Sequence, residues 1–242
     1  MHTLYLSIII PAHNEQNRLP ISLEKIDKFL QEQSYSYEVI IVENGSSDKT
    51  IEIVKEEQEK YPYLRLITAS KRGKGLAVKI GILEAKGQYR FIADADLSMP
   101  IEEIEKFLPP KLEVCEVAIG SREVKGAERI NEPSYRHMIG RIFNILIRFL
   151  ALPGIKDTQC GFKCFRADVA ETVFPLQTLD GMSFDVEVLY IARRLGFTIK
   201  EVPINWHFNS DSRVRLIKDS FQMGFDLLSI RHNARKDIYH PN

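Results

Sequence analysis

The chain has 242 residues, of which 44% are hydrophobic and 27% are charged, and its 33 basic and 33 acidic side chains balance. The length allows one large domain with a buried core. The balanced charge argues against a nucleic-acid-binding protein, which normally carries a basic excess. The ordinary apolar fraction excludes intrinsic disorder, and no uncharged apolar run is long enough to predict a membrane span.

The N-terminal segment and the cysteines favour a cytosolic protein. Met1 leads directly into the apolar run Leu4–Ile10, without the basic region and the cleavage site of a secretory signal. Cys115, Cys160 and Cys164 are an odd number of cysteines in a sizeable chain, which favours reduced thiols.

The first half of the chain alternates short runs of β-branched and aromatic residues with amphipathic patterns. The predicted strands are Leu4–Ile10, Val39–Val42, Leu64–Thr68, Tyr89–Ala93 and Val117–Ser121. The predicted helices are Ile21–Leu30, Ile51–Lys60, Leu76–Ala85 and Pro100–Leu108. This alternation predicts an α/β fold with a doubly wound, mostly parallel, Rossmann-like sheet.

The second half contains fewer strands and longer helices. The predicted helices are Tyr135–Leu152, Asp185–Leu195 and Leu216–Arg231, and the predicted strands are Phe162–Phe165 and Ile199–Ile204. No linker rich in Gly, Pro or Ser separates the two halves, and no internal repeat is present. We therefore expect a single domain over residues 1–242.

Four polar clusters follow predicted strands or open predicted helices. They are Pro11–Glu15, Glu43–Asp48, Lys71–Gly75 and Asp94–Ser98. Open α/β sheets bind their ligands beyond the carboxyl ends of the strands. The clusters therefore predict a ligand site at one edge of the sheet.

Two aspartates stand at the end of the fourth predicted strand. Asp94 and Asp96 concentrate negative charge that a divalent cation would neutralise, and Mg²⁺ is usually held by one or two carboxylates plus substrate phosphates. The alternative is that Asp96 or Ser98 caps the helix that begins near Pro100. The three neighbouring polar clusters favour the metal.

The basic loop also has two interpretations. Lys71, Arg72 and Lys74, together with two glycines, could hold a diphosphate against a helix N-terminus, or they could form a solvated turn. The loop lacks the P-loop pattern, and no Gly-x-Gly-x-x-Gly follows the first strand.

An ordered set of motifs carries a resemblance that covers nearly the whole chain. The motifs are Ser7–Glu15, Val42–Thr50, Asp94–Asp96, Gly120–Arg122, Asp157–Lys163, Phe184–Glu187 and Glu201–Trp206. In these segments the chain resembles the inverting family 2 glycosyltransferases. Within that family it is similar to the branch that transfers glucose or mannose to dolichyl and other polyprenyl phosphates.

The resemblance implies a glycosyltransferase A fold that binds a nucleotide sugar in residues 1–122 and the acceptor in residues 123–242. It implies nucleotide-sugar contacts from Pro11, His13, Glu15, Glu43, Asn44, Lys71, Lys74, Asp94, Ala95 and Asp96. It also implies Mg²⁺ or Mn²⁺ at Asp94, Asp96 and Ser98. The family usually has two aspartates where this chain has Glu43 and Asn44, which leaves the identity of the base open.

The resemblance also bears on catalysis. Asp96, Arg122, Asp185 and Glu187 are its candidate catalytic residues. A phosphate acceptor is mostly ionised at neutral pH and needs no general base. Asp185 and Glu187 remain candidates for a base or for hydrogen bonds to sugar hydroxyls, and the alternative is that they are acids that complement a helix N-terminus.

An acceptor that is a lipid phosphate needs cations and membrane contact. Lys156, Arg213 and Arg215 are the candidate cations for its phosphate. The predicted helix Tyr135–Leu152, which carries Arg141 and Arg148, is either an interfacial helix or a core helix. The last predicted helix, with Phe221, Phe225 and Leu228, has the same two interpretations.

The sequence therefore predicts metal-dependent, inverting transfer of a hexose from UDP-glucose to a polyprenyl phosphate at the cytosolic membrane face. The alternatives are a mannose synthase that uses GDP-mannose, a soluble transferase with a sugar hydroxyl as acceptor, and a nucleotidyltransferase. A membrane subunit is a possible partner, because the sequence predicts no membrane span, and nucleic acid is not expected.

Overall fold

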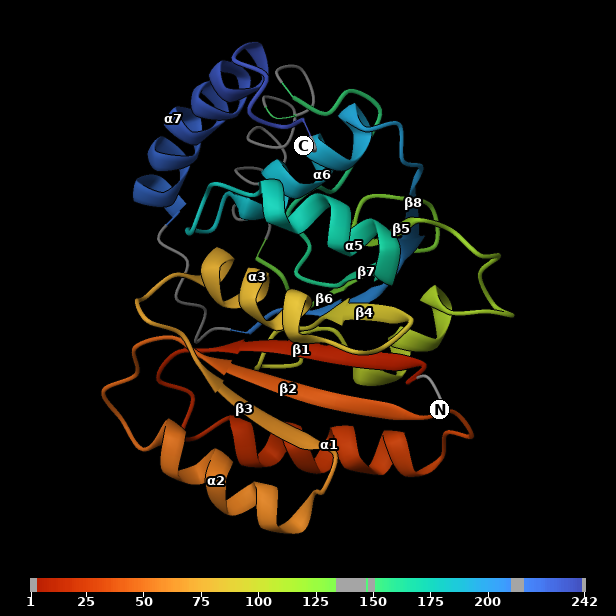
Figure 1. Ribbon diagram of the computed structural model, residues 1–242. Helices are drawn as coiled ribbons and strands as arrows, with labels where there is room; N and C mark the ends of the chain where they lie inside the picture. The colour runs from red at the N-terminus through yellow and green to blue at the C-terminus, as the bar shows by residue number, and fades with distance from the viewer. Residues whose placement is uncertain (1–3, 134–146, 148–150, 210–215, 241–242) are drawn as a thin grey trace.

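The computed structural model describes residues 4–133, 147, 151–209 and 216–240, with the side chains of the last segment described from residue 222 onward. A seven-stranded sheet of order β3-β2-β1-β4-β7-β5-β8 forms its centre. Helices α1 and α2 lie on one face of this sheet, and α3, α5, α6 and α7 lie on the other (Figure 1). The predicted α/β class and the mostly parallel sheet are confirmed.

The parallel part of the sheet is built from the first half of the chain. Its strands are β1 (Leu6–Ala12), β2 (Tyr37–Glu43), β3 (Leu64–Thr68) and β4 (Tyr89–Ile92). The connecting helices are α1 (Leu19–Gln31), α2 (Thr50–Lys60) and α3 (Lys74–Glu84). These bounds agree with the predicted ones to within a few residues, because the buried runs and the helical periodicity are both strong.

The rest of the sheet mixes strand directions. Strand β7 (Lys163–Arg166) runs antiparallel between β4 and β5 (Val117–Ser121), and β8 (Ile199–Pro203) is parallel to β5. The helices of this part are α5 (Ala167–Val173), α6 (Phe184–Arg194) and α7 (Leu216–Arg235). Because β7 is reversed, its first residue lies at the same edge as the last residues of β4 and β5.

Some elements differ from those predicted. Residues Ile101–Phe107 form a 3₁₀ helix, η1, rather than an α-helix, and Phe174–Leu176 form a second one, η2. Helix α5 was not predicted, nor was the two-stranded sheet of β6 (Glu128–Ile130) and β9 (Asn205–His207). The predicted helix Tyr135–Leu152 lies outside the described residues except for Ile147, Ala151 and Leu152.

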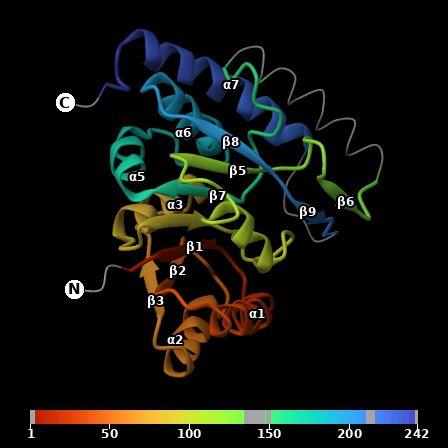
Figure 2. The same cartoon turned by 90° about the vertical axis from the view of Figure 1, so that its right-hand side faces the viewer.

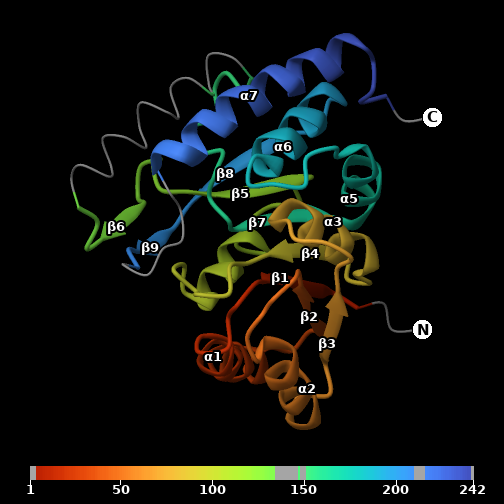
Figure 3. The same ribbon diagram turned by 90° about the vertical axis from the view of Figure 1, so that its left-hand side faces the viewer.

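The two faces of the sheet bury alternate residues of the same strands. Ile9 and Ile40 pack under α3 and α6, whereas Ile8 and Ile41 pack against α1. Such alternation is the pattern expected of a strand covered on both faces. Helix α7 lies along the outer side of α6, and β6 and β9 project beyond the main sheet (Figures 2 and 3).

Candidate active site

The polar clusters predicted from the sequence meet at the carboxyl edge of the sheet, on the left in Figure 1. Strands β1, β2 and β4 end there in parallel, and the N-terminus of α3 follows the end of β3. Strand β7 contributes its first residue, Lys163, which pairs in register with Ile92 of β4. Residues of both halves of the chain therefore line this edge.

Asn44 ties three of these loops together. Its side-chain amide donates to the carbonyl of Ala12 (2.9 Å), and its side-chain oxygen accepts from the backbone amide of Gly73 (3.2 Å). Its own carbonyl lies 3.2 Å from Nδ1 of His13. Asn44 is buried, so it holds the ends of β1 and β2 against the basic loop.

The other residues predicted to hold the base and ribose are gathered here as well. Pro11 lies within buried β1, and the backbone amide of Glu15 donates to Oγ1 of Thr50 (2.8 Å). The Glu43 carboxylate is buried and accepts a hydrogen bond from the backbone amide of Ser46. The arrangement thus places Glu43 beneath the loop that follows β2 rather than on its surface.

The basic loop packs against residues 177–181. The amide of Gly75 donates to the carbonyl of Asp180 (2.8 Å), and a Cβ atom at position 75 would lie 2.6 Å from the carbonyl oxygen of Leu179. Only glycine allows this approach. The ammonium of Lys71 pairs with Asp180 (2.7 Å) in an exposed ion pair, while Lys74 turns inward.

Lys74 and Asp94 form the central ion pair of the site. Nζ of Lys74 lies 2.6 Å from Oδ1 of Asp94. Burial works to raise the pKa of Asp94, but the charge and the hydrogen bond of Lys74 outweigh it, so this pKa lies below its ordinary value. Burial likewise opposes the charge of Lys74, but Asp94 and Asp185 raise its pKa. Both groups are therefore ionised at neutral pH.

Asp96 lies two residues after Asp94. Its Oδ1 accepts from the backbone amide of Ser98 (3.0 Å), and Leu97 between them has a positive φ of 46°. In the described part of the chain, no basic side chain forms an ion pair with Asp96. Ala95 is buried, and its carbonyl accepts from Ser22 Oγ (2.7 Å), which anchors the turn to α1.

These donors suit a divalent cation that shares its coordination with a bound phosphate. Within the described residues, no group of three His, Cys, Asp or Glu side chains could hold a metal ion. Mg²⁺, however, is usually bound by one or two carboxylates plus substrate phosphates. Asp94 and Asp96 provide such a set, and Ser98 lies beside it as the predicted further ligand.

Arg122 and Asp157 form a second, closed ion pair. Nε and Nη2 of Arg122 donate to the two carboxylate oxygens (2.7 and 2.9 Å), and the Arg122 backbone amide donates to Oδ2 (3.0 Å). Burial opposes the ionisation of Asp157, but Arg122 outweighs it and lowers the pKa to about 2. The guanidinium also lies 5.4 Å from the ring centroid of Trp206. Arg122 is thus held firmly at the carboxyl end of β5.

Asp185 and Glu187 begin α6 but differ in their surroundings. Oδ1 of Asp185 accepts from the buried ammonium of Lys163 (2.6 Å), and burial raises the pKa of Asp185 while Lys163 opposes this effect. Glu187 is fully buried and accepts from the amide of Leu179 (2.8 Å) and the hydroxyl of Tyr239 (2.7 Å). Its contacts favour a structural role at the loop 177–180, whereas Asp185 lies near Lys74.

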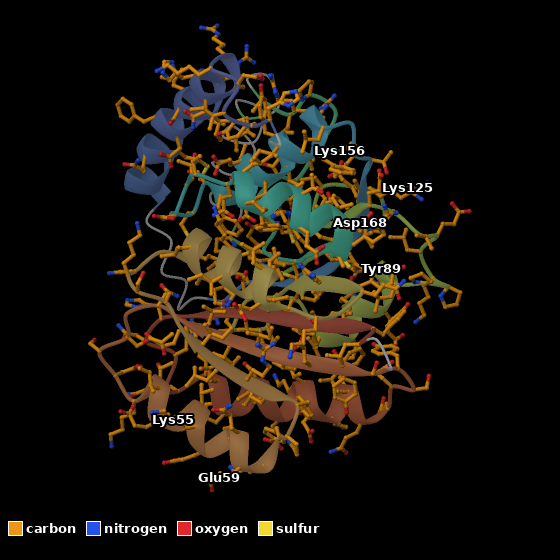
Figure 4. The ribbon with its side chains drawn as sticks, viewed as in Figure 1. Lys55, Glu59, Tyr89, Lys125, Lys156 and Asp168 are labelled. Atoms are coloured by element: carbon orange, nitrogen blue, oxygen red, sulfur yellow. The ribbon has the colours of Figure 1, made fainter. Side chains whose placement is uncertain are left out.

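The candidate acceptor cations are less defined. Lys156 is exposed, and its backbone amide donates to Glu201 of β8 (2.9 Å), in the region labelled in Figure 4. Arg213 and Arg215 lie outside the described residues, so their role stays a prediction.

Lys163 and Asp157 were not among the candidate site residues. Both belong to the motif Asp157–Lys163, which was recognised only for its resemblance. The available signal was a lysine within the apolar run Phe162–Phe165, since a charge in a buried strand requires a partner.

The sequence matches a known protein family and named relatives. A family model described as "Glycosyl transferase family 2" matches residues 7–174, and the chain belongs to that family. A relative named dolichyl-phosphate beta-glucosyltransferase from Dictyostelium discoideum is 38% identical over 94% of this chain and 74% of its own length. The protein of that name from Saccharomyces cerevisiae is 36% identical over 99% of this chain and 78% of its own length.

A solved structure supports the fold. Glucosyl-3-phosphoglycerate synthase from Mycobacterium tuberculosis, in complex with uridine diphosphate, matches with a TM-score of 0.65 and 18% identity over 94% of this chain and 80% of that chain. Another crystal of that synthase contains Mn²⁺, UDP-glucose and phosphoglyceric acid, and it matches with 17% identity and the same TM-score of 0.65. The fold is therefore that of the glycosyltransferase A type, and the chain is a glycosyltransferase.

Proposed function

We propose that this chain transfers glucose from UDP-glucose to dolichyl phosphate or a related polyprenyl phosphate, with inversion at the anomeric carbon. The observation that carries the proposal is the grouping of Asp94, Asp96 and Lys74 at the carboxyl edge of the sheet. The chain has 38% identity to a dolichyl-phosphate beta-glucosyltransferase along nearly its whole length, which supports the sugar and the acceptor.

Donor binding uses the first half of the chain, residues 1–122. Pro11, His13, Glu15 and Asn44 flank the nucleoside, Glu43 supports the loop after β2 from beneath, and the basic loop that opens α3 faces the diphosphate. A divalent cation, Mg²⁺ or Mn²⁺, held by Asp94, Asp96 and Ser98 would neutralise the charge that develops on the departing diphosphate.

Lys74 changes partner when the donor binds. Its ammonium is paired with Asp94 before binding, and the diphosphate offers it a second anion at the same edge. Lys71 and Arg122 add positive charge nearby, and both are already held by acids, at Asp180 and Asp157. Preorganised charges of this kind stabilise a developing anion without reorganisation during the reaction.

The chemical step needs no proton transfer. An ionised oxygen of the lipid phosphate attacks the anomeric carbon of glucose and forms the new carbon–oxygen bond. The bond between that carbon and the diphosphate breaks, and UDP departs with the electron pair. Because the acceptor is mostly ionised at neutral pH, a general base is dispensable. Lys156, Arg213 and Arg215 of the acceptor half, residues 123–242, then bind the lipid phosphate.

A lipid acceptor requires contact with a membrane, and we propose that the enzyme is a peripheral protein at the cytosolic face. None of the helices in the described part of the chain has the length and hydrophobicity that crossing a bilayer requires. On α7, however, Phe225 and Leu228 are 69% and 63% exposed, and Arg235 lies about two turns beyond Leu228. An exposed apolar face followed by basic residues suits the surface of an anionic bilayer.

Vesicle binding tests this membrane contact. Phe225→Glu should release the protein from vesicles that contain anionic lipid while leaving its unfolding midpoint unchanged, because the side chain is 69% exposed. Val114→Glu is the matched control, since Val114 is 63% exposed on a loop far from α7. Wild-type protein that ignores every vesicle would instead favour recruitment by a membrane subunit.

A transfer assay tests the function itself. Purified protein, a short polyprenyl phosphate in detergent and Mn²⁺ should convert UDP-glucose to a β-linked lipid-phosphate glucose. GDP-mannose as the better donor would indicate a mannose synthase. Transfer to the hydroxyl of a free sugar, or release of pyrophosphate from a nucleoside triphosphate, would contradict the proposal.

A further inference from the structure

Lys163 is a fully buried lysine at the start of β7, beside the carboxyl end of β4. Its register partners are Ile92 of β4 and Ile119 of β5, and its side chain has no exposed surface. Removing a charge from water costs several kcal/mol unless good partners compensate it. The ammonium finds two partners, Oδ1 of Asp185 (2.6 Å) and the carbonyl of Cys160.

The Lys163–Asp185 pair belongs to a larger arrangement of alternating charges. Asp94 is influenced by the cations Lys74 and Lys163, and Asp185 is influenced by the same two cations. The pairs Lys74–Asp94 and Lys163–Asp185 thus form a quartet of two lysines and two aspartates. Lys74 and Asp94 are its donor-side members, and Lys163 is the one that the proposed mechanism does not use.

Lys163 also fixes the backbone that covers Asp94. The carbonyl it holds belongs to Cys160, and the next residue is Gly161. A Cβ atom at position 161 would lie 2.1 Å from Oδ2 of Asp94, so the peptide backbone packs directly on that carboxylate. A single ammonium therefore sets the positions of two site carboxylates, one through a direct bond and one through the main chain.

Asp185 itself is only half satisfied. Although it is 3% exposed, hydrogen bonds from the described residues reach its Oδ1 alone. A carboxylate oxygen can accept more than one hydrogen bond, so Oδ2 has capacity for a ligand hydroxyl. Lys163 anchors Oδ1 and leaves Oδ2 for such a hydroxyl.

We propose that Lys163 is a positioning residue that orients the Asp185 carboxylate toward a hydroxyl of the transferred hexose, so that one oxygen is anchored and the other binds sugar. This inference rests on the proposed function and deepens it. It assigns the sugar subsite to Asp185, and it assigns the orientation of the Asp185 carboxylate to Lys163, which does not touch the ligand. Its effect passes through Asp185, so the two side chains must act as one unit.

A double-mutant cycle tests the proposal. Lys163→Met keeps the length of the side chain and removes its charge, Asp185→Asn removes the partner, and the double variant removes both. Each single variant should lower kcat by about 100-fold, since a small misplacement of a reacting group has that effect. The double variant should be no slower than the slower single variant, because residues that act as a unit are not additive.

Binding measurements separate positioning from general damage. Each variant should bind UDP as the wild type does, whereas its preference for UDP-glucose over UDP should disappear. Lys163→Met leaves Asp185 buried without its partner and should lower the unfolding midpoint, and the double variant should recover it. Recovery of the midpoint without recovery of kcat is the signature expected of a positioning residue.

The ion pair of Arg65 and Glu38, at the amino edge of the sheet, is the control. Arg65→Met with Glu38→Gln removes an ion pair of similar length (2.7 Å) and should change stability without changing kcat. The inference is overturned if Asp185→Asn turns over at the wild-type rate, if the Lys163→Met/Asp185→Asn variant recovers turnover together with stability, or if it is much slower than Asp185→Asn. A wild-type chain that transfers no glucose overturns the proposed function, and this inference with it.

Discussion

The two edges of the main sheet both bury carboxylates, but they satisfy them differently. At the amino edge, Glu38 accepts hydrogen bonds from Ser7 Oγ, the amide of Lys86 and Nη1 of Arg65, all at 2.7 Å. At the carboxyl edge, the hydrogen bonds from described residues to Asp94 and Asp96 come from one group each, Lys74 and the amide of Ser98. A carboxylate that accepts hydrogen bonds from several protein groups is saturated and stabilises the fold. A carboxylate that accepts from one group is unsaturated and can still bind a ligand.

The contrast separates stability from activity along one sheet. Glu38 is surrounded by donors from the strands and loops of its own half, so a ligand there would have to break existing bonds. Asp94 and Asp96 lie on a turn, and their carboxylate oxygens have lone pairs that accept no hydrogen bond from the described residues. The Rossmann-like architecture explains this placement, because the carboxyl ends of parallel strands meet where loops, rather than neighbouring strands, supply the partners.

The largest effect is expected at Asp96. Asp96→Asn should reduce turnover by at least about 1000-fold, because a neutral amide replaces an anionic metal ligand. Its free energy of unfolding should change by less than about 0.5 kcal/mol, since the side chain makes one hydrogen bond near the surface. Initial rates and urea unfolding measure the two quantities. Wild-type turnover that persists in EDTA would contradict the metal assignment.

Asp157 lies at the carboxyl edge, but its carboxylate is saturated like that of Glu38. It is fully buried and accepts three hydrogen bonds from Arg122. Asp157→Asn should cost about 3 kcal/mol of unfolding free energy, because it removes the charge that pairs with the Arg122 guanidinium, whose side chain is only 20% exposed. Urea unfolding at neutral pH measures this cost, and a loss below about 1 kcal/mol would show that the pair is not tightly coupled to folding.

The same pair has a pH signature. The pKa of Asp157 falls from 3.8 to about 2 in the folded chain, so its contribution to stability is complete above the ordinary pKa and is lost as the pH falls towards 2. The free-energy difference between wild type and Asp157→Asn should therefore shrink by about 2 kcal/mol between pH 6 and pH 2. A difference that stays constant over this range would place the origin of the effect elsewhere.

Glu38→Gln tests the amino edge. The amide keeps the shape of the side chain but loses the charge that Arg65 binds, and we expect a loss of about 1 to 2 kcal/mol in unfolding free energy. Turnover per folded molecule should stay at the wild-type level, because the residue lies at the edge opposite the site. If kcat fell together with stability, the two edges would be coupled, and stability and activity would not be separated between them.

The sequence predicts the parallel part of the fold and the position of its site well. Runs such as Leu64–Thr68 and Val117–Ser121 are apolar and bounded by polar residues, and the structure has strands with these same bounds. The grouping of the strand-end clusters follows from the parallel topology alone. The strands of three residues each, β6 and β9, are too short and too polar to give a periodic signal.

What the sequence does not give is the choice of partner for each charge. It identifies Lys74 and Asp94 as site residues, yet the bond between them joins α3 to the end of β4 across 20 positions. It proposes Asp185 and Glu187 with equal weight, although one lies beside Lys74 and the other anchors Tyr239. Burial decides between them, and burial depends on packing that no local pattern encodes.

The smallest effect on stability is expected for Lys71, whose pair with Asp180 is exposed on both sides. Lys71→Ala should change the unfolding free energy by less than about 0.5 kcal/mol, because solvent screens such a pair. The affinity for UDP, measured by calorimetry with Mn²⁺, should fall by about fivefold, since one positive charge near the diphosphate is worth about 1 kcal/mol.

Lys60→Ala is the matched control: Lys60 is 62% exposed and paired with Glu57 at the end of α2. It should leave both stability and affinity unchanged. An unchanged affinity in Lys71→Ala would limit this lysine to its bond with Asp180, and the carboxyl edge would then bind the diphosphate through Lys74 without it.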